Sequence, residues 1–290
     1  MSRLNQNREC EHMAEKKTRK TKADKKEAEE EARPAPGKLY IYDLEGKVAG
    51  EQDLPVAFKH ELRTDIIRRA VSAIEANARQ PYAPSPTAGM RHSVQTWGKG
   101  RGVSRVQRLM GSSTAAQSPN NVGGRRAHPP KVEKDLGKKI NKKELLFGKF
   151  SALRATSELE LVRKRGHRFD EKLTVPVVVK DDFESIATTK DAVKALSSLG
   201  VYDDVERALV GRNVRAGRGK MRGRRHRIPK SLLVVLSKDC DGGRSLRNLP
   251  GVDVVTPNAL NASNLAPGGD PGRLMLISET ALKTVGGWAR

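Results

Sequence analysis

Acidic residues are missing from one long stretch of this 290-residue chain. From Ala76 to Val132 there are nine Lys or Arg and not a single Asp or Glu, while glycine and proline are frequent. The surface of a globular domain carries charges of both signs, so an acid-free run of this length is typical of a segment that lies against a polyanion. The net charge of +22 for the whole chain agrees with such a partner.

Aromatic residues, cysteines and long apolar runs are also scarce. Aromatics make up 4% of the chain, which argues against a protein that reads bases mainly by stacking and favours backbone and shape recognition. The two cysteines, Cys10 and Cys240, form neither a disulfide framework nor a zinc site, so we expect a reduced, cytoplasmic environment. No apolar run is long enough for a membrane span, and we expect no membrane partner.

The acid-free stretch has too few apolar side chains to fold by itself. Fixing the backbone costs roughly 1–2 kcal/mol per residue, whereas each larger apolar side chain returns at most roughly 1.5–3 kcal/mol on burial. A structureless segment of this length inside a compact domain is usually either a functional extension or disordered. We therefore expect residues 79–131 to form an extended loop that a phosphate backbone orders through ion contacts and counterion release.

The rest of the chain predicts one α/β globular domain over residues 38–290, interrupted by that loop. Short, nearly continuous apolar runs indicate strands buried on both faces, and helical patterns alternate with them, so we expect an open, mostly parallel sheet flanked by helices. The expected strands are Leu39–Asp43, Val175–Val179, Leu232–Leu236, Val252–Val255 and Leu274–Ile277. The expected helices are His60–Ala78, Asn141–Lys164, Lys190–Ser198, Asp203–Val210, Arg244–Leu249 and Glu279–Val285.

The N-terminal residues, 1–37, have the composition of a charged, disordered tail. Charge blocks alternate from Ala14 to Arg33 without one strongly apolar residue, so this segment has nothing to bury. We expect a solvated extension; a weak contact with RNA or a partner is the alternative. Met13 is a second candidate for the start of the chain.

A second acid-free cluster lies between Gly211 and Lys230, directly before the expected strand Leu232–Leu236. Glycines among its cations allow close approach to a phosphate chain. The alternatives are a flexible, solvated loop or a run like a nuclear-localisation signal, but two such clusters in one chain favour nucleic acid. The candidate contacts here are Arg212, Arg215, Arg218, Lys220, Arg222, Arg224, Arg225, His226 and Arg227.

An α/β core also raises the possibility of an enzyme that acts on RNA or nucleotides. The phosphate-binding motifs are incomplete, since Gly219-Lys220 has Val214 where a P-loop needs glycine and Met221 where it needs Ser or Thr. The histidines are scattered, and no nucleophile elbow or zinc motif occurs. We therefore predict no catalytic site, cofactor or metal. A chromatin-like DNA protein shares the charge pattern but has no need of a buried α/β domain with a long arm.

Three segments carry a family signature when taken together: Thr96–Arg108, Gly123–Lys131 and Lys149–Asp170. They resemble the universal L-four family of large-subunit ribosomal proteins in its archaeal and eukaryotic form. The resemblance covers the chain from about Lys38 to the C-terminus. The long C-terminal extension of the eukaryotic proteins is absent, which favours an archaeal source.

The resemblance implies an rRNA-binding structural constituent of the large ribosomal subunit, cytoplasmic and serving translation. In this family the extended loop is held by rRNA, and its tip lines the nascent peptide exit tunnel beside another ribosomal protein. The expected partners are therefore large-subunit rRNA, neighbouring ribosomal proteins and the nascent peptide. Mapped onto this chain, the tip falls between Trp97 and Asn120.

The loop residues expected to contact rRNA lie on two limbs. Trp97 is expected to stack on a base or on an arginine, or to act as a local packing anchor. Arg91, Lys99, Arg101, Arg105 and Arg108 are assigned to the limb that leads in, near His92, and Arg125, Arg126, His128 and Lys131 to the limb that leads out.

Limited proteolysis tests the expected ordering of the loop. In the free protein, trypsin should cut first within residues 79–131, because the segment has no packed core to protect it. Saturating nucleic acid should slow these cuts strongly, because the bound phosphate backbone orders and covers the loop. Equal cleavage rates in the free and bound states would contradict the prediction.

Overall fold

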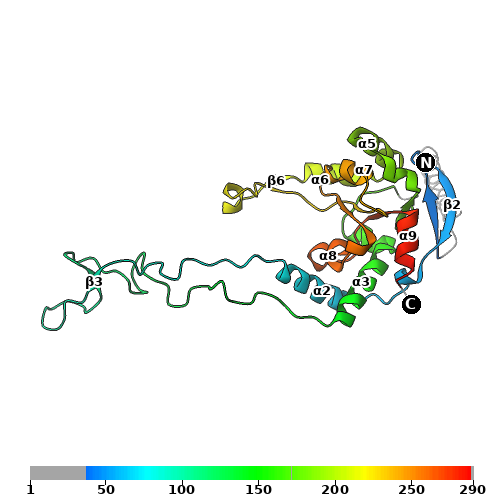
Figure 1. Cartoon of the computed structure of the whole chain (residues 1–290). Helices are drawn as coiled ribbons and strands as arrows, with labels where there is room; N and C mark the ends of the chain where they lie inside the picture. Colours follow the sequence, from blue (N-terminus) through cyan, green and yellow to red (C-terminus); the bar gives the residue numbers. More distant parts are fainter. Residues whose placement is uncertain (1–36, 171, 289–290) are drawn as a thin grey trace, which may run out of the picture. The chain divides into compact units, whose positions relative to one another are not determined.

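The computed structural model describes residues 37–170 and 172–288 (Figure 1). Contacts divide the chain into two units. We call the described residues up to Ser72, together with those from Ile140 on, the α/β unit, and the segment Ala73–Lys139 the arm. The tail expected over residues 1–37 lies outside the described residues except for Gly37.

A six-stranded sheet forms the centre of the α/β unit, in the order β2-β1-β5-β10-β8-β9. The first two strands pair antiparallel through a turn at Gly46, and all other neighbouring strands are parallel. This confirms the expected open, mostly parallel sheet. The strands are β1 (Lys38–Tyr42), β2 (Val48–Asp53), β5 (Val177–Val179), β8 (Leu233–Val235), β9 (Asp253–Val255) and β10 (Met275–Ser278).

Helices cover both faces of this sheet. No helix in the described part of the chain is long and apolar enough to cross a membrane. The α-helices are α2 (Thr64–Asn77), α3 (Lys142–Thr156), α4 (Leu159–Lys164), α5 (Thr189–Ser198), α6 (Tyr202–Val210), α7 (Asp241–Arg247), α8 (Ala262–Leu265) and α9 (Glu279–Gly286).

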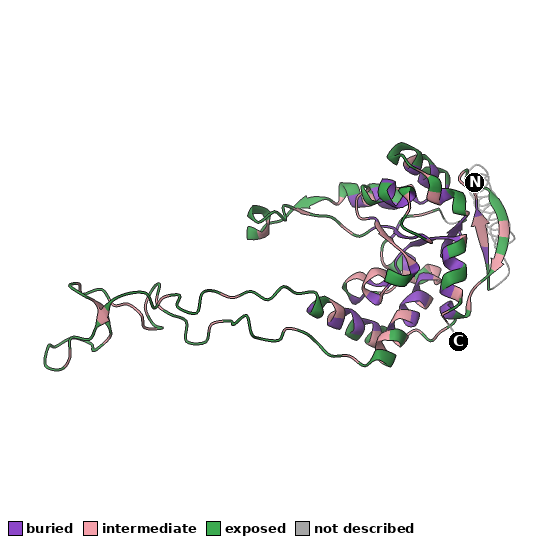
Figure 2. Ribbon diagram, in the orientation of Figure 1, coloured by how far each residue is buried: buried purple, intermediate pink, exposed green. Residues whose placement is uncertain are grey.

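The two faces of the sheet pack against different helices (Figures 1 and 2). Val177, Val234 and Leu276 belong to one cluster of buried residues with side chains of α5, α6 and α7. The alternate strand residues, such as Val178 and Ile277, are also fully buried, and the alternation of side chains along a strand puts them on the opposite face. Figure 1 draws α3, α8 and α9 on the other side of the sheet from α5, α6 and α7. Because the strands are buried on both sides, their sequences are continuous apolar runs rather than alternating ones.

One sequence expectation is wrong, because Asn141–Lys164 is not a single helix. α3 ends at Thr156, where the Ser157 hydroxyl donates to the Arg154 carbonyl at 2.8 Å. Glu158 then takes an extended conformation before α4 begins. Both helices bury core residues, Leu153 in α3 and Val162 in α4, and the break lets each helix direct its own apolar side chain inward.

Acidic side chains lie at the carboxyl ends of the parallel strands and pair with cations there, Asp43 with Lys180 and Asp239 with Arg247. The amino ends of β8 and β10 instead follow Lys230 and Arg273. The cationic cluster Gly211–Lys230 therefore enters the sheet at the amino ends of the strands.

Candidate nucleic-acid interface

The arm consists of two extended limbs with very little buried surface (Figures 1 and 2). No residue from 77 to 139 is buried, and this whole stretch is described. The limbs come together at Gly89, which has a φ of +77°, and a Cβ added there would lie 2.6 Å from the Arg125 nitrogen. At the base, the Lys138 amide donates to the Asn77 side chain at 3.0 Å. The arm is thus held by backbone contacts rather than by a core.

A small hairpin forms the far part of the arm. β3 (Val94–Gln95) pairs antiparallel with β4 (Arg108–Leu109). The Gln117 side-chain amide donates to the carbonyl of Met90 at 2.6 Å and to that of His92 at 3.3 Å. Gln117, a residue of the expected tip, is therefore tied to the limb that leads in.

Trp97 lies against Arg108 in this hairpin. The guanidinium carbon of Arg108 is 5.0 Å from the centre of the indole ring, within the range of a cation–π contact. The same guanidinium donates to the Ser104 carbonyl at 3.4 Å and to the Ser113 carbonyl. Of the roles expected for Trp97, the structure contains the contact with an arginine, and 39% of the tryptophan stays exposed.

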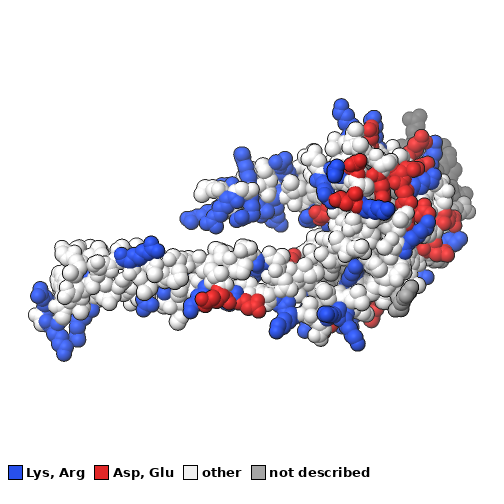
Figure 3. Space-filling view, viewed as in Figure 1, with Lys and Arg blue, Asp and Glu red and all other residues white. Residues whose placement is uncertain are grey.

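Three of the cations assigned to the limb that leads in lie on the turn of this hairpin. Lys99, Arg101 and Arg105 fall between β3 and β4, because the strand pairing folds residues 94–109 back on themselves. Figure 3 shows Lys and Arg gathered at the end of the arm. The remaining expected contacts are all exposed: Arg91, His92, Arg125, Arg126, His128 and Lys131.

The second cationic cluster, Gly211–Lys230, forms a short hairpin, which we call the basic hairpin. β6 (Asn213–Val214) pairs antiparallel with β7 (His226–Arg227), and a 3-10 turn, Arg218–Met221, lies between them. All its predicted cations are exposed, and none has a carboxylate partner among the described residues. They are Arg212, Arg215, Arg218, Lys220, Arg222, Arg224, Arg225 and Arg227.

His226 reports on the positive field of the basic hairpin. Burial and the neighbouring charges of Arg212 and Arg225 lower the pKa of this imidazole below its ordinary value. Its Nδ1 atom is buried without a hydrogen-bond partner among the described residues. Burial, the larger cause, and the neighbouring cations thus both disfavour a positive charge on this ring.

Asp204 closes the base of the basic hairpin. This fully buried carboxylate is hydrogen-bonded to His167 Nδ1 at 2.9 Å and accepts from Arg207 Nε at 2.8 Å and from the Arg168 amide at 3.1 Å. Arg207 in turn donates to the Lys230 carbonyl at 2.9 Å, which joins α6, before the hairpin, to the residue that ends it. Burial alone would raise the pKa of Asp204, but these hydrogen bonds outweigh it and the pKa lies below its usual range.

A second buried charge pair fixes the strand that follows the hairpin. Arg273 is fully buried and pairs with Asp253 at 2.7 Å. Its guanidinium also donates to the carbonyls of Ser231 and Asn264, both at 2.9 Å. Lys230 Nζ binds the same Asp253 carboxylate at 2.8 and 2.9 Å. The start of β8, and with it the end of the basic hairpin, is thereby anchored.

A third group of cations was missed by the sequence reasoning. It is formed by Arg68, Lys164, Arg165 and Arg207, which lie on separate elements around one cavity of the α/β unit. Only the run Lys164–Arg168 was visible as a basic signal in the sequence. The other members are scattered among acidic residues, so only the fold brings them together.

Comparisons with known proteins agree on one family. The profile of the Ribosomal protein L4/L1 family matches residues 53–288. Large ribosomal subunit protein uL4 of Thermoplasma acidophilum is 48% identical over 248 residues, covering 86% of this chain and 97% of the relative. Those of Archaeoglobus fulgidus (46% over 251 residues, 87% and 99%) and Methanoculleus marisnigri (48% over 249 residues, 85% and 97%) are similarly close.

The Asp204 site leads to a pH-dependent stability prediction. Because its folded pKa is depressed, Asp204 contributes stability above the unfolded value of about 3.9, and this is lost as the pH falls through the lower folded pKa. Asp204→Asn should lower the free energy of unfolding at pH 7 by about 3 kcal/mol. Chemical denaturation from pH 7 to pH 2 should show the difference from wild type shrinking in acid. Asp203→Asn, a neighbouring exposed carboxylate, is the control, and an equal loss there would contradict the assignment.

Proposed function

We propose a function from one premise: this chain belongs to the ribosomal protein L4/L1 family. Its relatives named above are archaeal proteins of the large ribosomal subunit. The chain is accordingly a ribosomal protein of the archaeal type, a structural component of the large subunit that serves translation in the cytoplasm. The sequence identity over most of both chains carries this conclusion.

Within that role, the chain binds large-subunit rRNA through two separate cationic segments. The observation that carries this proposal is the lack of counterions: the eight cations Arg212–Arg227 of the basic hairpin have no carboxylate partner in the described part of the protein. Exposed cations of one sign repel one another, so such a surface is stabilised by a polyanion that replaces the missing carboxylates. The nine cations of the acid-free stretch in the arm likewise have no acidic residue between them along the sequence.

The far part of the arm is the segment we assign to the wall of the peptide exit tunnel. Its hairpin bears Lys99, Arg101 and Arg105 on one turn, and its backbone is held by local hydrogen bonds rather than by a core. A wall element needs a defined backbone with side chains that face outward, and this hairpin supplies both. The limbs between the hairpin and the base are the parts proposed to lie along rRNA.

The competing function, an RNA- or nucleotide-acting enzyme, is less well supported. Open α/β enzymes bind their ligands at the carboxyl ends of the strands. Here Glu184 fills that edge, accepting from the Ser237 amide, the Ser237 hydroxyl and the Ser278 hydroxyl, each at 2.6 Å. The cations beside it are paired with carboxylates, Lys180 with Asp43 and Arg247 with Asp239. The cations of the basic hairpin lie at the opposite edge, which supports a binding role.

Competition binding tests the rRNA assignment. The full chain and a chain lacking Ser93–Asn120 are titrated with large-subunit rRNA fragments and with duplex DNA of equal charge at several salt concentrations. We expect one RNA fragment to be preferred at moderate salt, and the deletion to weaken this binding only partly because the basic hairpin still binds. The deleted chain should keep its fold, since no residue from 77 to 139 is buried.

Two results would count against that proposal. Equal and steeply salt-dependent binding to RNA and DNA would reduce it to generic phosphate attraction. Unfolding of the deleted chain, measured by circular dichroism, would contradict the independence of the arm from the α/β unit.

Translation assays test the tunnel assignment separately. Replacing both Arg101 and Arg105 with Gln should change the stalling of a regulatory nascent peptide in reconstituted ribosomes by about threefold or more, because the charge on the wall changes. Subunit assembly should be nearly unchanged. The matched control replaces Arg125 and Arg126, which lie outside the hairpin turn. Unaltered stalling with Arg101→Gln and Arg105→Gln would refute the assignment.

A further inference from the structure

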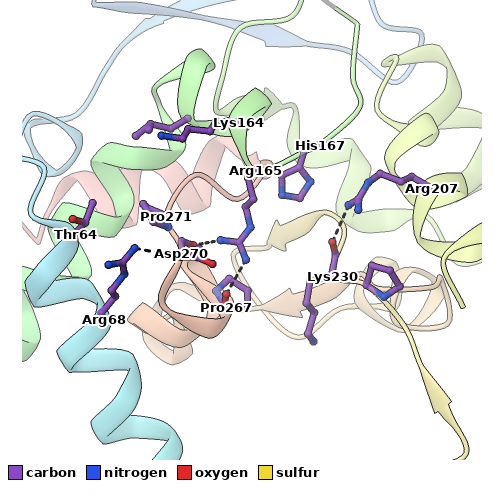
Figure 4. Close-up of a pocket in the computed structure, with 12 residues that line it drawn as sticks. Thr64, Arg68, Lys164, Arg165, His167, Arg207, Lys230, Pro267, Asp270 and Pro271 are labelled. Atoms are coloured by element: carbon purple, nitrogen blue, oxygen red, sulfur yellow. Dashed lines mark hydrogen bonds and ion pairs between the residues drawn. The ribbon is translucent and has the colours of Figure 1, made fainter. Parts of the chain in front are cut away.

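A cavity of about 580 Å³ lies beside the base of the basic hairpin (Figure 4). All its lining residues belong to the α/β unit, and they come from α2, α4, α6, the end of the basic hairpin and the loop before β10. Five of them are cations, and Asp270 is the single carboxylate. The residues that matter to its chemistry are Arg68, Lys164, Arg165, His167, Arg207 and Lys230.

Arg165 is a cation without a carboxylate partner among the described residues. Its guanidinium donates to the carbonyls of Pro267, at 2.8 Å, and of Asp270. The Asp270 carboxylate instead lies 3.8 Å from Arg68. Burial and the nearby charge of Arg273 lower the pKa of Arg165 below its ordinary value. The positive charge at this wall is therefore held by neutral carbonyls, and an anion in the cavity would stabilise it.

His167 offers an unused polar atom at the same wall. Its side chain is 1% exposed, and its Nδ1 is hydrogen-bonded to Asp204 at 2.9 Å. That bond sets the ring orientation and leaves Nε2, which is buried and has no hydrogen-bond partner within the described ranges. A buried polar atom without a partner is uncommon in a native protein and calls for a ligand or an ordered water. Figure 4 shows the ring beside Arg165.

The other cations differ in how far they are already neutralised. Arg207 and Lys230 are paired with Asp204 and Asp253. Lys164 has no ion pair with any described residue. The cavity thus combines two cations without a carboxylate partner among the described residues, Lys164 and Arg165, with three cations that have one and with a buried imidazole nitrogen. An oxyanion with several acceptor atoms matches this set, because arginine and lysine donate to phosphate oxygens. His167, whose Nδ1 is bonded to the Asp204 carboxylate, adds an Nε2 donor when its ring is doubly protonated.

We propose that this cavity binds a phosphate group, and that the group belongs to the RNA backbone. The source follows from the chain path: Pro229 and Lys230 line the cavity and also end the basic hairpin, so an RNA strand along the hairpin reaches the cavity. A free inorganic or nucleotide phosphate offers the same chemistry and is distinguished below. This inference rests on the proposed rRNA-binding function and adds a defined site to it.

Charge removal at the rim tests the site without disturbing the buried network. Arg68→Gln combined with Lys164→Gln should weaken binding of the preferred rRNA fragment about tenfold and lower the salt slope by about one, since the contact with one phosphate is lost. The matched control is Lys172→Gln with Lys190→Gln, two exposed lysines that do not line the cavity. Equal effects of the two double variants would overturn the inference.

Nitrogen-15 NMR of the full chain gives a direct measure at His167. Its imidazole signal, assigned with His167→Gln, should shift as the rRNA fragment saturates the protein and should stay unchanged with inorganic phosphate or adenosine monophosphate. A shift with those small anions alone would overturn the RNA source. An unmoved signal with rRNA bound would overturn the site while the proposed function stands, whereas failure of the full chain to bind rRNA at all would remove the proposed function itself.

Discussion

The ion pair between the buried Arg273 and the partly exposed Asp253 is the constraint on which the rest of the structure depends. A guanidinium with no exposed surface is tolerated only if its donors are satisfied. Here they meet Asp253 at 2.7 Å and the carbonyls of Ser231 and Asn264. These groups belong to the starts of β8 and β9 and to α8, so one side chain holds together the edge of the sheet where the basic hairpin enters. Lys230, bound to the same carboxylate, carries this anchoring into the hairpin.

The same electrostatic rule separates the framework from the binding surface. Where charges are buried, as at Asp204 and Arg273, each has partners of opposite sign. Along the basic hairpin, the exposed cations have none in the part of the chain that the structure describes. Repulsion between these cations destabilises the folded state of the free protein. A bound polyanion removes that repulsion and so stabilises the fold. Folding and binding thus draw on different sets of charges within one chain.

The direction of the strands decides which edge of the sheet is used. At their carboxyl ends, Glu184 and the serines Ser237 and Ser278 form a closed set of hydrogen bonds, and other carboxylates lie around it. At their amino ends lie the basic hairpin and the cavity around Arg165 and His167. Nucleotide enzymes with an α/β fold bind their ligands at the carboxyl ends of the strands, whereas the cations of this chain lie at the amino ends. The long arm is a separate extended unit.

The sequence by itself determined those elements that depend only on residues close together in the chain. The buried strands, the helix near Thr64–Asn77 and both acid-free segments follow from periodicity and charge, and the sheet type follows from continuous apolar runs such as Leu274–Ile277. The tertiary structure decided what depends on contacts distant in the chain. It broke the helix at Ser157, placed Arg101 on a hairpin turn, and brought Arg68, Arg165 and His167 to one cavity. Such juxtapositions follow from packing and from the pairing of buried charges, which no local pattern records.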